Sequence, residues 1–323
     1  MKSPEQLRNL FEEWLHDLPF PPQPANLYGA IRYFLANGGK RIRPLLCLLG
    51  NELYNGPGTD VMHIATAIEL FHNYSLVHDD IMDNSPTRRG MDTVHVRYGK
   101  PTAIVVGDTL LIRSVEEINR IAVPNRNKII GLFLKTAREV CEGQQMDLDQ
   151  EAAGIGNVTY EDYLHMITRK TAVLLAASIT LGAMAAQVSS YQQELLYSYG
   201  KNLGIAFQLQ DDLIDAFGDP AKTGKQQGGD IIENKNTALL IKALERCNPQ
   251  QRQLLLDAMA MQSPDKVPAV LTIFKDCGVD LWAKEEVGIY TDYAFQKIDE
   301  LSMPEEGRNI LRSLATQLVA RQA

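Results

Sequence analysis

The chain carries the same acidic pattern at two places. Residues 79–83 read DDIMD and residues 211–215 read DDLID; we call them the first and second aspartate clusters. Each lies at the end of a segment with a helical pattern, and on a helix the first and last aspartates of a cluster are neighbours on one face. Such like charges repel, and hard oxygen ligands suit Mg²⁺ or Mn²⁺ better than zinc. The pattern therefore predicts two divalent-cation sites.

A connection containing glycine and cations follows each cluster. Arg88 and Arg89 follow the first cluster, whereas residues 218–234, with Lys225 among four glycines, follow the second and lead to Lys235. Carboxylates alone would repel a diphosphate, but bridging divalent ions reverse that repulsion and leave Arg and Lys to bind the remaining oxygens. We expect the connection after the second cluster to be a mobile lid.

Two more segments bring cations close to backbone that can approach an anion. Residues 38–44 read GGKRIRP and place Lys40 and Arg43 within one turn of each other. Lys170 and Thr171 precede an apolar run, and we expect a helix break near Lys170 that leaves free N–H groups there.

The elements that must position these residues are helical. We expect helices over 3–18, 25–37, 42–54, 60–83, 102–122, 126–151, 160–187, 191–217, 235–247, 249–262, 266–276, 279–301 and 303–321. Ser3 and Gln6 form a capping-box pattern with Pro4 in the first turn. No run alternates like a strand and no hairpin signal stands out, so the sequence predicts an all-α protein.

Composition excludes several classes of protein. The net charge is −8 and no basic stripe is visible, which speaks against a nucleic-acid partner. The four cysteines lack zinc-type spacing, and we expect no signal peptide and therefore a cytoplasmic location. The longest apolar stretch, 171–186, is short for a bilayer span, so we expect no transmembrane segment.

The chain resembles the trans-isoprenyl diphosphate synthases, or polyprenyl synthetase family, and among them the short-chain type. The resemblance rests on motifs that follow one another in the family's order: the 38–44 segment, the first cluster with its arginine pair, Lys170-Thr171, and FQLQDDLID at 207–215. The resemblance implies one domain over residues 1–323, with a motif-bearing core of about 25–240, folded as a helical bundle around a deep central cavity. It also implies a homodimer.

The resemblance implies a role for each motif residue. The Mg²⁺ ligands, for three ions and with Mn²⁺ as an alternative, would be Asp79, Asp83, Asp211 and, through water, Asp215. The allylic diphosphate (dimethylallyl, geranyl or farnesyl) would bind to Arg88, Lys170, Lys225 and Lys235. Isopentenyl diphosphate would bind to Lys40, Arg43, His72 and Arg89. Thr171 and Gln208 would face the reacting carbons.

The implied reaction is a head-to-tail (1'-4) condensation. The allylic C–O bond ionises, the double bond of isopentenyl diphosphate attacks the cation, and a proton is lost to the released diphosphate. Helical spacing places Ser75 and Phe71 one and two turns beneath Asp79, where the tail would grow. The resemblance adds Tyr74 as a further limit, and the first cluster lacks the two-residue insertion of many bacterial farnesyl synthases, which favours geranylgeranyl diphosphate (C20) over farnesyl diphosphate (C15).

Two rival functions remain open at this level. A class I terpene cyclase uses similar metals, although its second motif normally mixes Asn/Asp, Ser/Thr and Glu and it needs no second diphosphate pocket. A non-catalytic partner subunit would have lost part of a cluster, and this chain keeps both. Several residues also have ordinary readings: Phe71 and Tyr74 as core, and Arg41 as a structural or surface cation. His78 is left unassigned, and Asn234 stands where many family members have glycine.

Overall fold

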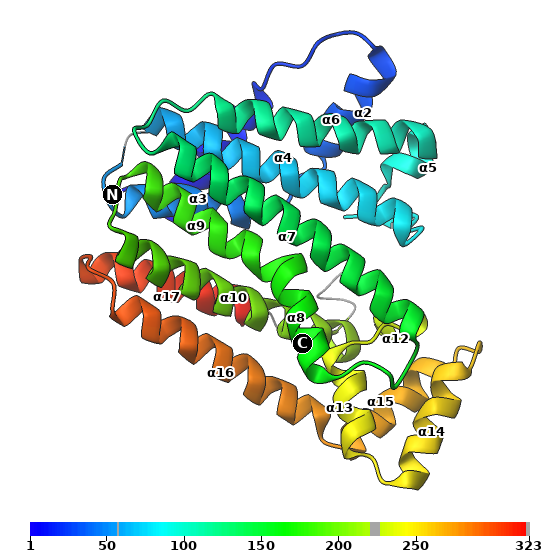
Figure 1. The fold of residues 1–323 in the computed structure, drawn as a ribbon. Coiled ribbons are helices and arrows are strands. Elements are labelled where there is room, and N and C mark those ends of the chain that lie inside the picture. Colours follow the sequence, from blue (N-terminus) through cyan, green and yellow to red (C-terminus); the bar gives the residue numbers. More distant parts are fainter. Residues whose placement is uncertain (57, 220–226, 321–323) are drawn as a thin grey trace. The chain divides into compact units, whose positions relative to one another are not determined.

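The fold of this computed structural model is almost entirely helical. The structure describes residues 1–56, 58–219 and 227–320, and within these ranges the only strands form one short hairpin (Figure 1). Contacts divide the chain into two compact units. Unit 1 comprises residues 1–137 and 177–193, and unit 2 comprises residues 138–176 and 194–323. The predicted all-α class is confirmed.

Unit 1 contains the first aspartate cluster. Its elements are α1 (Pro4–His16), α2 (Ala25–Ala36), α3 (Ile42–Glu52), α4 (Gly58–Met82), β1 (Thr87–Arg88), β2 (Met91–Asp92), α5 (Val94–Tyr98) and α6 (Lys100–Asn119). Parts of α7 (Arg126–Ala153), α9 (Val173–Ala185) and α10 (Ser190–Phe217) complete it. Helix α4 packs against both α3 and α6 and is apolar on most sides, so it forms the centre of this unit.

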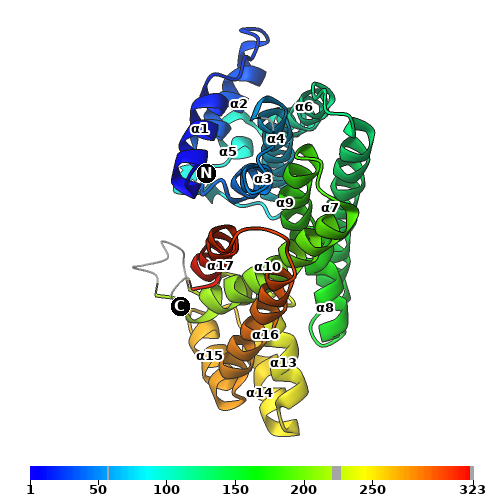
Figure 2. The same ribbon diagram turned by 90° about the vertical axis from the view of Figure 1, so that its left-hand side faces the viewer.

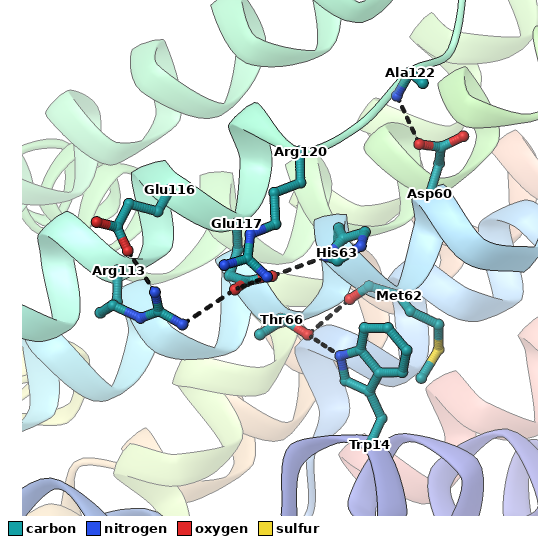
Figure 3. A network of polar contacts seen from close by, with 10 residues as sticks. All are labelled: Trp14, Asp60, Met62, His63, Thr66, Arg113, Glu116, Glu117, Arg120 and Ala122. Atoms are coloured by element: carbon teal, nitrogen blue, oxygen red, sulfur yellow. Dashed lines mark hydrogen bonds and ion pairs between the residues drawn. The ribbon is translucent and has the colours of Figure 1, made fainter. Parts of the chain in front are cut away.

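A buried polar network joins α4 to α6 (Figure 3). Glu117 of α6 has no exposed side-chain surface and accepts a hydrogen bond from His63 Nδ1 of α4 at 2.8 Å. Arg113 and Arg120 each lie 3.4 Å from the other carboxylate oxygen of Glu117. Removing one partner of such a buried carboxylate would leave an uncompensated charge, so the network specifies how the two helices meet.

Helix α1 is attached to the same face of α4. The indole Nε1 of Trp14 donates to Thr66 Oγ1 at 2.9 Å, and Thr66 donates in turn to the Met62 carbonyl (Figure 3). The predicted capping box at the start of α1 is present, with Ser3 and Gln6 bonding reciprocally.

Unit 2 contains the second aspartate cluster. Besides its parts of α7, α9 and α10 it has α8 (Tyr160–Ile167), a π-helical turn η1 (Thr168–Ala172), α12 (Gly229–Ile232), α13 (Ala238–Arg246), α14 (Pro249–Ala260), α15 (Lys266–Asp276), α16 (Val279–Asp299) and α17 (Glu305–Val319). Helices α13, α14 and α15 pack on one another, and α16 packs along α17 (Figure 2). The short helix α12 packs on α15. One core of buried side chains runs from α8 and α10 to α16.

One predicted feature of the fold is wrong, and two short elements were not predicted. The predicted break near Lys170 is absent, because α8, η1 and α9 form one continuous helix from Tyr160 to Ala185. The hairpin β1–β2 and the short helix α5 were not expected, since two-residue strands are too short to show alternation. Helix Tyr160–Ala185 is also the one described helix long and apolar enough to suit a bilayer, and 78% of its most apolar window is buried.

Candidate functional site

The first aspartate cluster separates into one structural and two accessible carboxylates. Asp80 is 1% exposed, and its Oδ1 accepts a hydrogen bond from Arg88 Nε at 2.8 Å. Burial raises the pKa of Asp80, and the charge of Arg88 opposes that rise. Asp79 and Asp83, one helical turn apart, are only half-buried. The outer pair is therefore the part of this cluster that can reach a ligand.

The hairpin after the first cluster turns its two arginines to different partners. Its strands pair in register Thr87 with Asp92, and the two turn residues, Arg89 (φ 53°) and Gly90 (φ 77°), both have positive φ. This is the pattern of a type I′ turn, which matches the twist of a tight hairpin. Arg88 bonds back to Asp80, whereas Arg89 donates to the carbonyl of Gly38. The sequence signal was missed because the turn is Arg-Gly instead of Asn-Gly.

The glycines of the 38–44 segment make room for Arg89. A Cβ on Gly39 would lie 2.8 Å from the Arg89 guanidinium, and Gly39 has a φ of 142°, so a larger residue would be strained and would displace the arginine. Asn37 adds a second tie by donating to the Arg88 carbonyl at 3.0 Å. Lys40, which follows Gly39, is exposed. The segment thus holds Arg89 against its own backbone at Gly38 and Gly39.

Arg41 is a structural cation and not a surface one. Its side chain is 2% exposed and donates to Glu69 at 2.6 Å, to Glu12 at 2.9 Å and to the Leu35 carbonyl at 2.9 Å. The residue has a φ of 47° and precedes α3. This contact fixes the 38–44 segment on α4.

Arg43, His72 and the nearby Arg89 form a cationic cluster in unit 1. Arg43 Nη1 lies 3.0 Å from His72 Nε2, and because an arginine can only donate, His72 Nε2 accepts and its proton is on Nδ1. Burial, together with the nearby arginines, holds the pKa of His72 well below its usual value. Burial also lowers the pKa of Arg43 to about 10, so Arg43 stays charged at neutral pH.

The predicted chain-length residues lie on α4, within three residues of His72. Phe71 is fully buried and packs edge-on against Phe133 of α7, with ring centroids 6.1 Å apart. Tyr74 is half-buried, and its ring centroid lies 5.5 Å from that of Phe71. Ser75 donates to the His72 carbonyl at 2.9 Å. Phe71 is thus part of the core, whereas Tyr74 keeps an accessible surface.

The second aspartate cluster repeats the separation seen in the first. Asp212 is 5% exposed and accepts from Tyr163 Oη at 2.8 Å, from the Ala238 N–H at 3.1 Å and from Gln208 Nε2 at 3.2 Å. Burial raises the pKa of Asp212 to about 7, and these hydrogen bonds oppose the rise. Asp211 and Asp215 are half-buried, like the outer aspartates of the first cluster.

An additional acid, Asp230, joins the second cluster. Its backbone N–H donates to Asp215 Oδ2 at 3.0 Å, and burial together with the charges of Asp215 and Asp212 raises its pKa well above the usual value. Sequence reasoning missed Asp230 because it lies in what was expected to be loop, whereas the four-residue helix α12 holds it. The Lys235 N–H donates to the Asp230 carbonyl at 2.9 Å, so Lys235 is positioned beside this acid. Lys225 lies outside the described residues.

The departure at Asn234 has a structural explanation. Asn234 has a φ of 60°, a region in which glycine is unstrained and asparagine is the best-tolerated alternative. Its Oδ1 accepts a hydrogen bond from Lys266 Nζ at 2.8 Å, and Lys266 also donates to the Ile232 carbonyl. Asparagine therefore supports the end of α12 in a way that glycine could not.

Lys170 and Thr171 lie on the π-helical turn. Lys170 Nζ is paired with Asp147 of α7, and Thr171 Oγ1 donates to Gln208 Oε1 of α10 at 3.2 Å. Gln208 bonds onward to Asp212, so this network reaches the second cluster. Because the helix is continuous, the expected free N–H groups at Lys170 are absent from this described segment. π-helical turns occur frequently at functional sites.

The outer aspartates fit a magnesium ion better than a metal held by protein alone. Among the described residues, no three His, Cys, Asp or Glu side chains are grouped closely enough to hold a metal ion by themselves. Mg²⁺ normally keeps several waters and uses one or two carboxylates together with substrate phosphates. In the first cluster, Asp80 Oδ2 is buried without a hydrogen-bond partner, so that site is not saturated by protein donors.

Comparisons with known proteins agree with this geometry. Residues 24–277 match the family model described as polyprenyl synthetase. The chain is 36% identical over 316 residues to a geranylgeranyl pyrophosphate synthase of Geoglobus acetivorans, covering 97% of this chain and 96% of the relative. A crystal structure of a geranylgeranyl pyrophosphate synthase superposes with a TM-score of 0.94 at 38% identity and 100% coverage of both chains. A Corynebacterium glutamicum geranylgeranyl pyrophosphate synthase, solved with isoprenyl diphosphate and magnesium, superposes with a TM-score of 0.87 at 29% identity, covering 99% of this chain and 98% of that one.

These matches confirm the predicted class of enzyme, a prenyltransferase. The match to the family model extends beyond the motif-bearing core on which the resemblance rested. The chain belongs to the polyprenyl synthetase family.

Proposed function

We propose that this protein condenses isopentenyl diphosphate with an allylic diphosphate, head to tail and in the trans configuration, to give geranylgeranyl diphosphate. The chain acts as one catalytic domain. The observation that carries the proposal is the cationic cluster of unit 1, where Arg43, His72 and Arg89 come together. Burial is the main reason why the pKa values of His72 and Arg43 are lowered, and the positive charge of the nearby Arg89 adds to the lowering of both. A bound anion would offset this accumulation of positive charge.

The diphosphate of isopentenyl diphosphate binds to this cluster and to Lys40. Its ligands are thus Lys40, Arg43, His72 and Arg89. Arg43 is fixed by His72, and Arg89 is fixed by the Gly38 carbonyl, so both guanidinium groups are positioned before the substrate arrives. Preorganised donors cost little reorganisation on binding. A second diphosphate site of this kind is what a condensing enzyme needs and a terpene cyclase does not.

The allylic diphosphate is held by Arg88, Lys170, Lys225 and Lys235, and its metal ions by Asp79, Asp83, Asp211 and Asp215. Mg²⁺, when bound, supplies the positive charge that lets diphosphate leave. The similar Corynebacterium glutamicum enzyme was solved with isoprenyl diphosphate and magnesium, which supports a magnesium-dependent reaction. The number of ions, three, is proposed from the family resemblance.

The remaining residues protect and direct the cation. Thr171 and Gln208, joined by a hydrogen bond of 3.2 Å, present polar oxygens to the reacting carbons. The aromatic rings of Phe71 and Tyr74 supply a dry wall beneath the first cluster and cation–π stabilisation. The allylic C–O bond breaks first, with its electron pair leaving on the diphosphate. The double bond of isopentenyl diphosphate then attacks the allylic cation to form the new C–C bond, and the released diphosphate takes up the proton that is lost.

The protein is proposed to act as a cytoplasmic homodimer. Helix α6 carries Ile104, Val105, Ile112 and Val115, each more than a third exposed, at helical spacing on one face. Val96 of α5 is 50% exposed and Leu134 of α7 is 46% exposed. An apolar stripe of this kind is suited to a second copy of the same surface about a twofold axis.

Incubation of the purified protein with Mg²⁺, labelled isopentenyl diphosphate and allylic primers from C5 to C15 tests the function. We expect incorporation and a C20 alcohol after dephosphorylation. Asp79→Ala and Asp211→Ala should each lower turnover by about two to three orders of magnitude, because ligands for the metals are lost. Asp257→Ala, an exposed aspartate on α14, is the matched control. Failure to incorporate on every primer, or conversion of the allylic substrate alone to hydrocarbon, would overturn the proposal.

A further inference from the structure

His78, which directly precedes the first aspartate cluster, sits in a slot on α6. A Cβ on Gly107 would lie 2.2 Å from His78 Nε2, so only glycine leaves room for the imidazole at this crossing. His78 Nε2 lies 3.2 Å from the Ile104 carbonyl, and because a carbonyl oxygen only accepts, this nitrogen carries the proton. Asp108 Oδ1 of α6 lies 3.8 Å from the same nitrogen. The imidazole is thus held by three residues of α6: Ile104, Gly107 and Asp108.

The other edge of the imidazole faces Tyr74. The two ring centroids are 4.8 Å apart with an interplanar angle of 65°, one helical turn apart on α4. On its far side Tyr74 contacts Phe71, which in turn packs on Phe133. The four rings form a continuous row: Phe133, Phe71, Tyr74 and His78. Within this row Tyr74 is half-buried and can meet a substrate tail, whereas Phe71 is completely buried.

We propose that His78, seated on Gly107, is a positioning residue for product length, because it holds the Tyr74 ring in the path of the growing isoprenoid tail. This inference rests on the proposed function and on the family resemblance, which implies that Tyr74 limits elongation. The physical reason is that Tyr74 has two flanking rings, and loss of one allows its side chain to rotate away from the tail. The position of the ring, and not only its presence, then decides where elongation stops.

The test compares product chain lengths, which a general loss of stability would not shift in one direction. His78→Ala should raise the ratio of products longer than C20 to C20 by about two- to tenfold, the factor expected for losing one aromatic contact. Tyr74→Ala should lengthen the products directly. In the Tyr74→Ala background, His78→Ala should add nothing, because its effect acts through the tyrosine. His78→Phe keeps a ring against Tyr74 and should keep C20 as the main product.

Gly107 gives a second, independent arm. Gly107→Ala should change the product ratio in the wild-type background, since the new methyl group displaces the imidazole, and should have no effect in the His78→Ala background. Gly131→Ala is the matched control, because a Cβ at Gly131 meets nothing within 4 Å. Unchanged products in His78→Ala, or lengthening that simply adds to that of Tyr74→Ala, would overturn the inference. If the wild type elongates no primer at all, the proposed function fails instead.

Discussion

Arg41 and Glu69 form an ion pair in the interior of unit 1, with Nη1 and Oε1 2.6 Å apart and side chains only 2% and 3% exposed. The pair joins the segment that carries Lys40 and Arg43 to helix α4, which carries His72. Glu69 lies three residues before His72 on α4, and Arg41 lies two residues before Arg43. The pair therefore fixes Arg43 and His72 of the cationic cluster relative to each other. Arg41, a motif residue that binds no substrate, is therefore needed to hold the cationic cluster together.

Arg41→Met should destabilise the protein by about 3–5 kcal/mol, because it leaves Glu69 buried without its partner. The measurement is the shift of the denaturant or thermal unfolding midpoint. Lys297→Met removes a more exposed pair with Glu300, of the same 2.6 Å length, and should change the midpoint little. A small effect of Arg41→Met would mean that the buried pair does not hold the segment.

His72 should make the protein less stable in mild acid. Its folded-state pKa is depressed well below the unfolded value of about 6.5, so the unfolded chain binds a proton that the folded chain does not. The free energy of unfolding is therefore unaffected by His72 above about pH 6.5 and decreases as the pH falls below that value, because only the unfolded chain gains the proton. Melting curves of wild type and His72→Gln between about pH 5 and 8 should diverge in this direction, whereas parallel curves would contradict the assignment.

The two aspartates at the start of the second cluster should behave differently. Asp212→Ala leaves Tyr163 Oη and the Ala238 N–H without their acceptor, which costs about 1–3 kcal/mol for each buried group, so unfolding should occur at lower denaturant concentration. Asp211→Ala should lower turnover with little change in the unfolding midpoint. Equal loss of stability in both variants would show that the division into structural and accessible carboxylates is wrong.

Gly143→Ala should disturb the π-helical turn. A Cβ at Gly143 would lie 2.2 Å from the Lys170 backbone nitrogen, so α7 and the turn must move apart. We expect lower turnover and a lower melting temperature. Gly131→Ala, on the same helix with open space around it, should keep both or raise the melting temperature slightly through helix propensity. Wild-type turnover in Gly143→Ala would exclude a role for this close approach.

The exposed stripe on α6 predicts the oligomeric state. Ile112, 60% exposed, should be buried against a second copy, so Ile112→Asp should convert dimer to monomer in light scattering after size-exclusion chromatography. Leu281→Asp, on α16 and 66% exposed, is the matched control and should leave the dimer intact. A monomeric wild type, or an intact dimer in Ile112→Asp, would place the interface elsewhere.

The sequence by itself determined the helical class, the two aspartate clusters and the cationic segments. Helical periodicity, capping residues such as Ser3 and the spacing of charged residues are local properties, so they can be predicted without coordinates. The family resemblance supplied the roles, because the motifs follow one another in a specific order.

Tertiary structure alone decided which member of each motif is structural. Asp80, Arg41 and Asp212 look like their neighbours in the sequence, but each is buried by residues distant along the chain, such as Tyr163 against Asp212. Tertiary structure also brings together Cys247 and Cys277, which are 30 residues apart in the sequence and whose sulfur atoms lie 3.0 Å apart. Burial depends on packing between segments far apart in the chain, and this is why Asp230 and the His78 slot on Gly107 could not be predicted from local pattern.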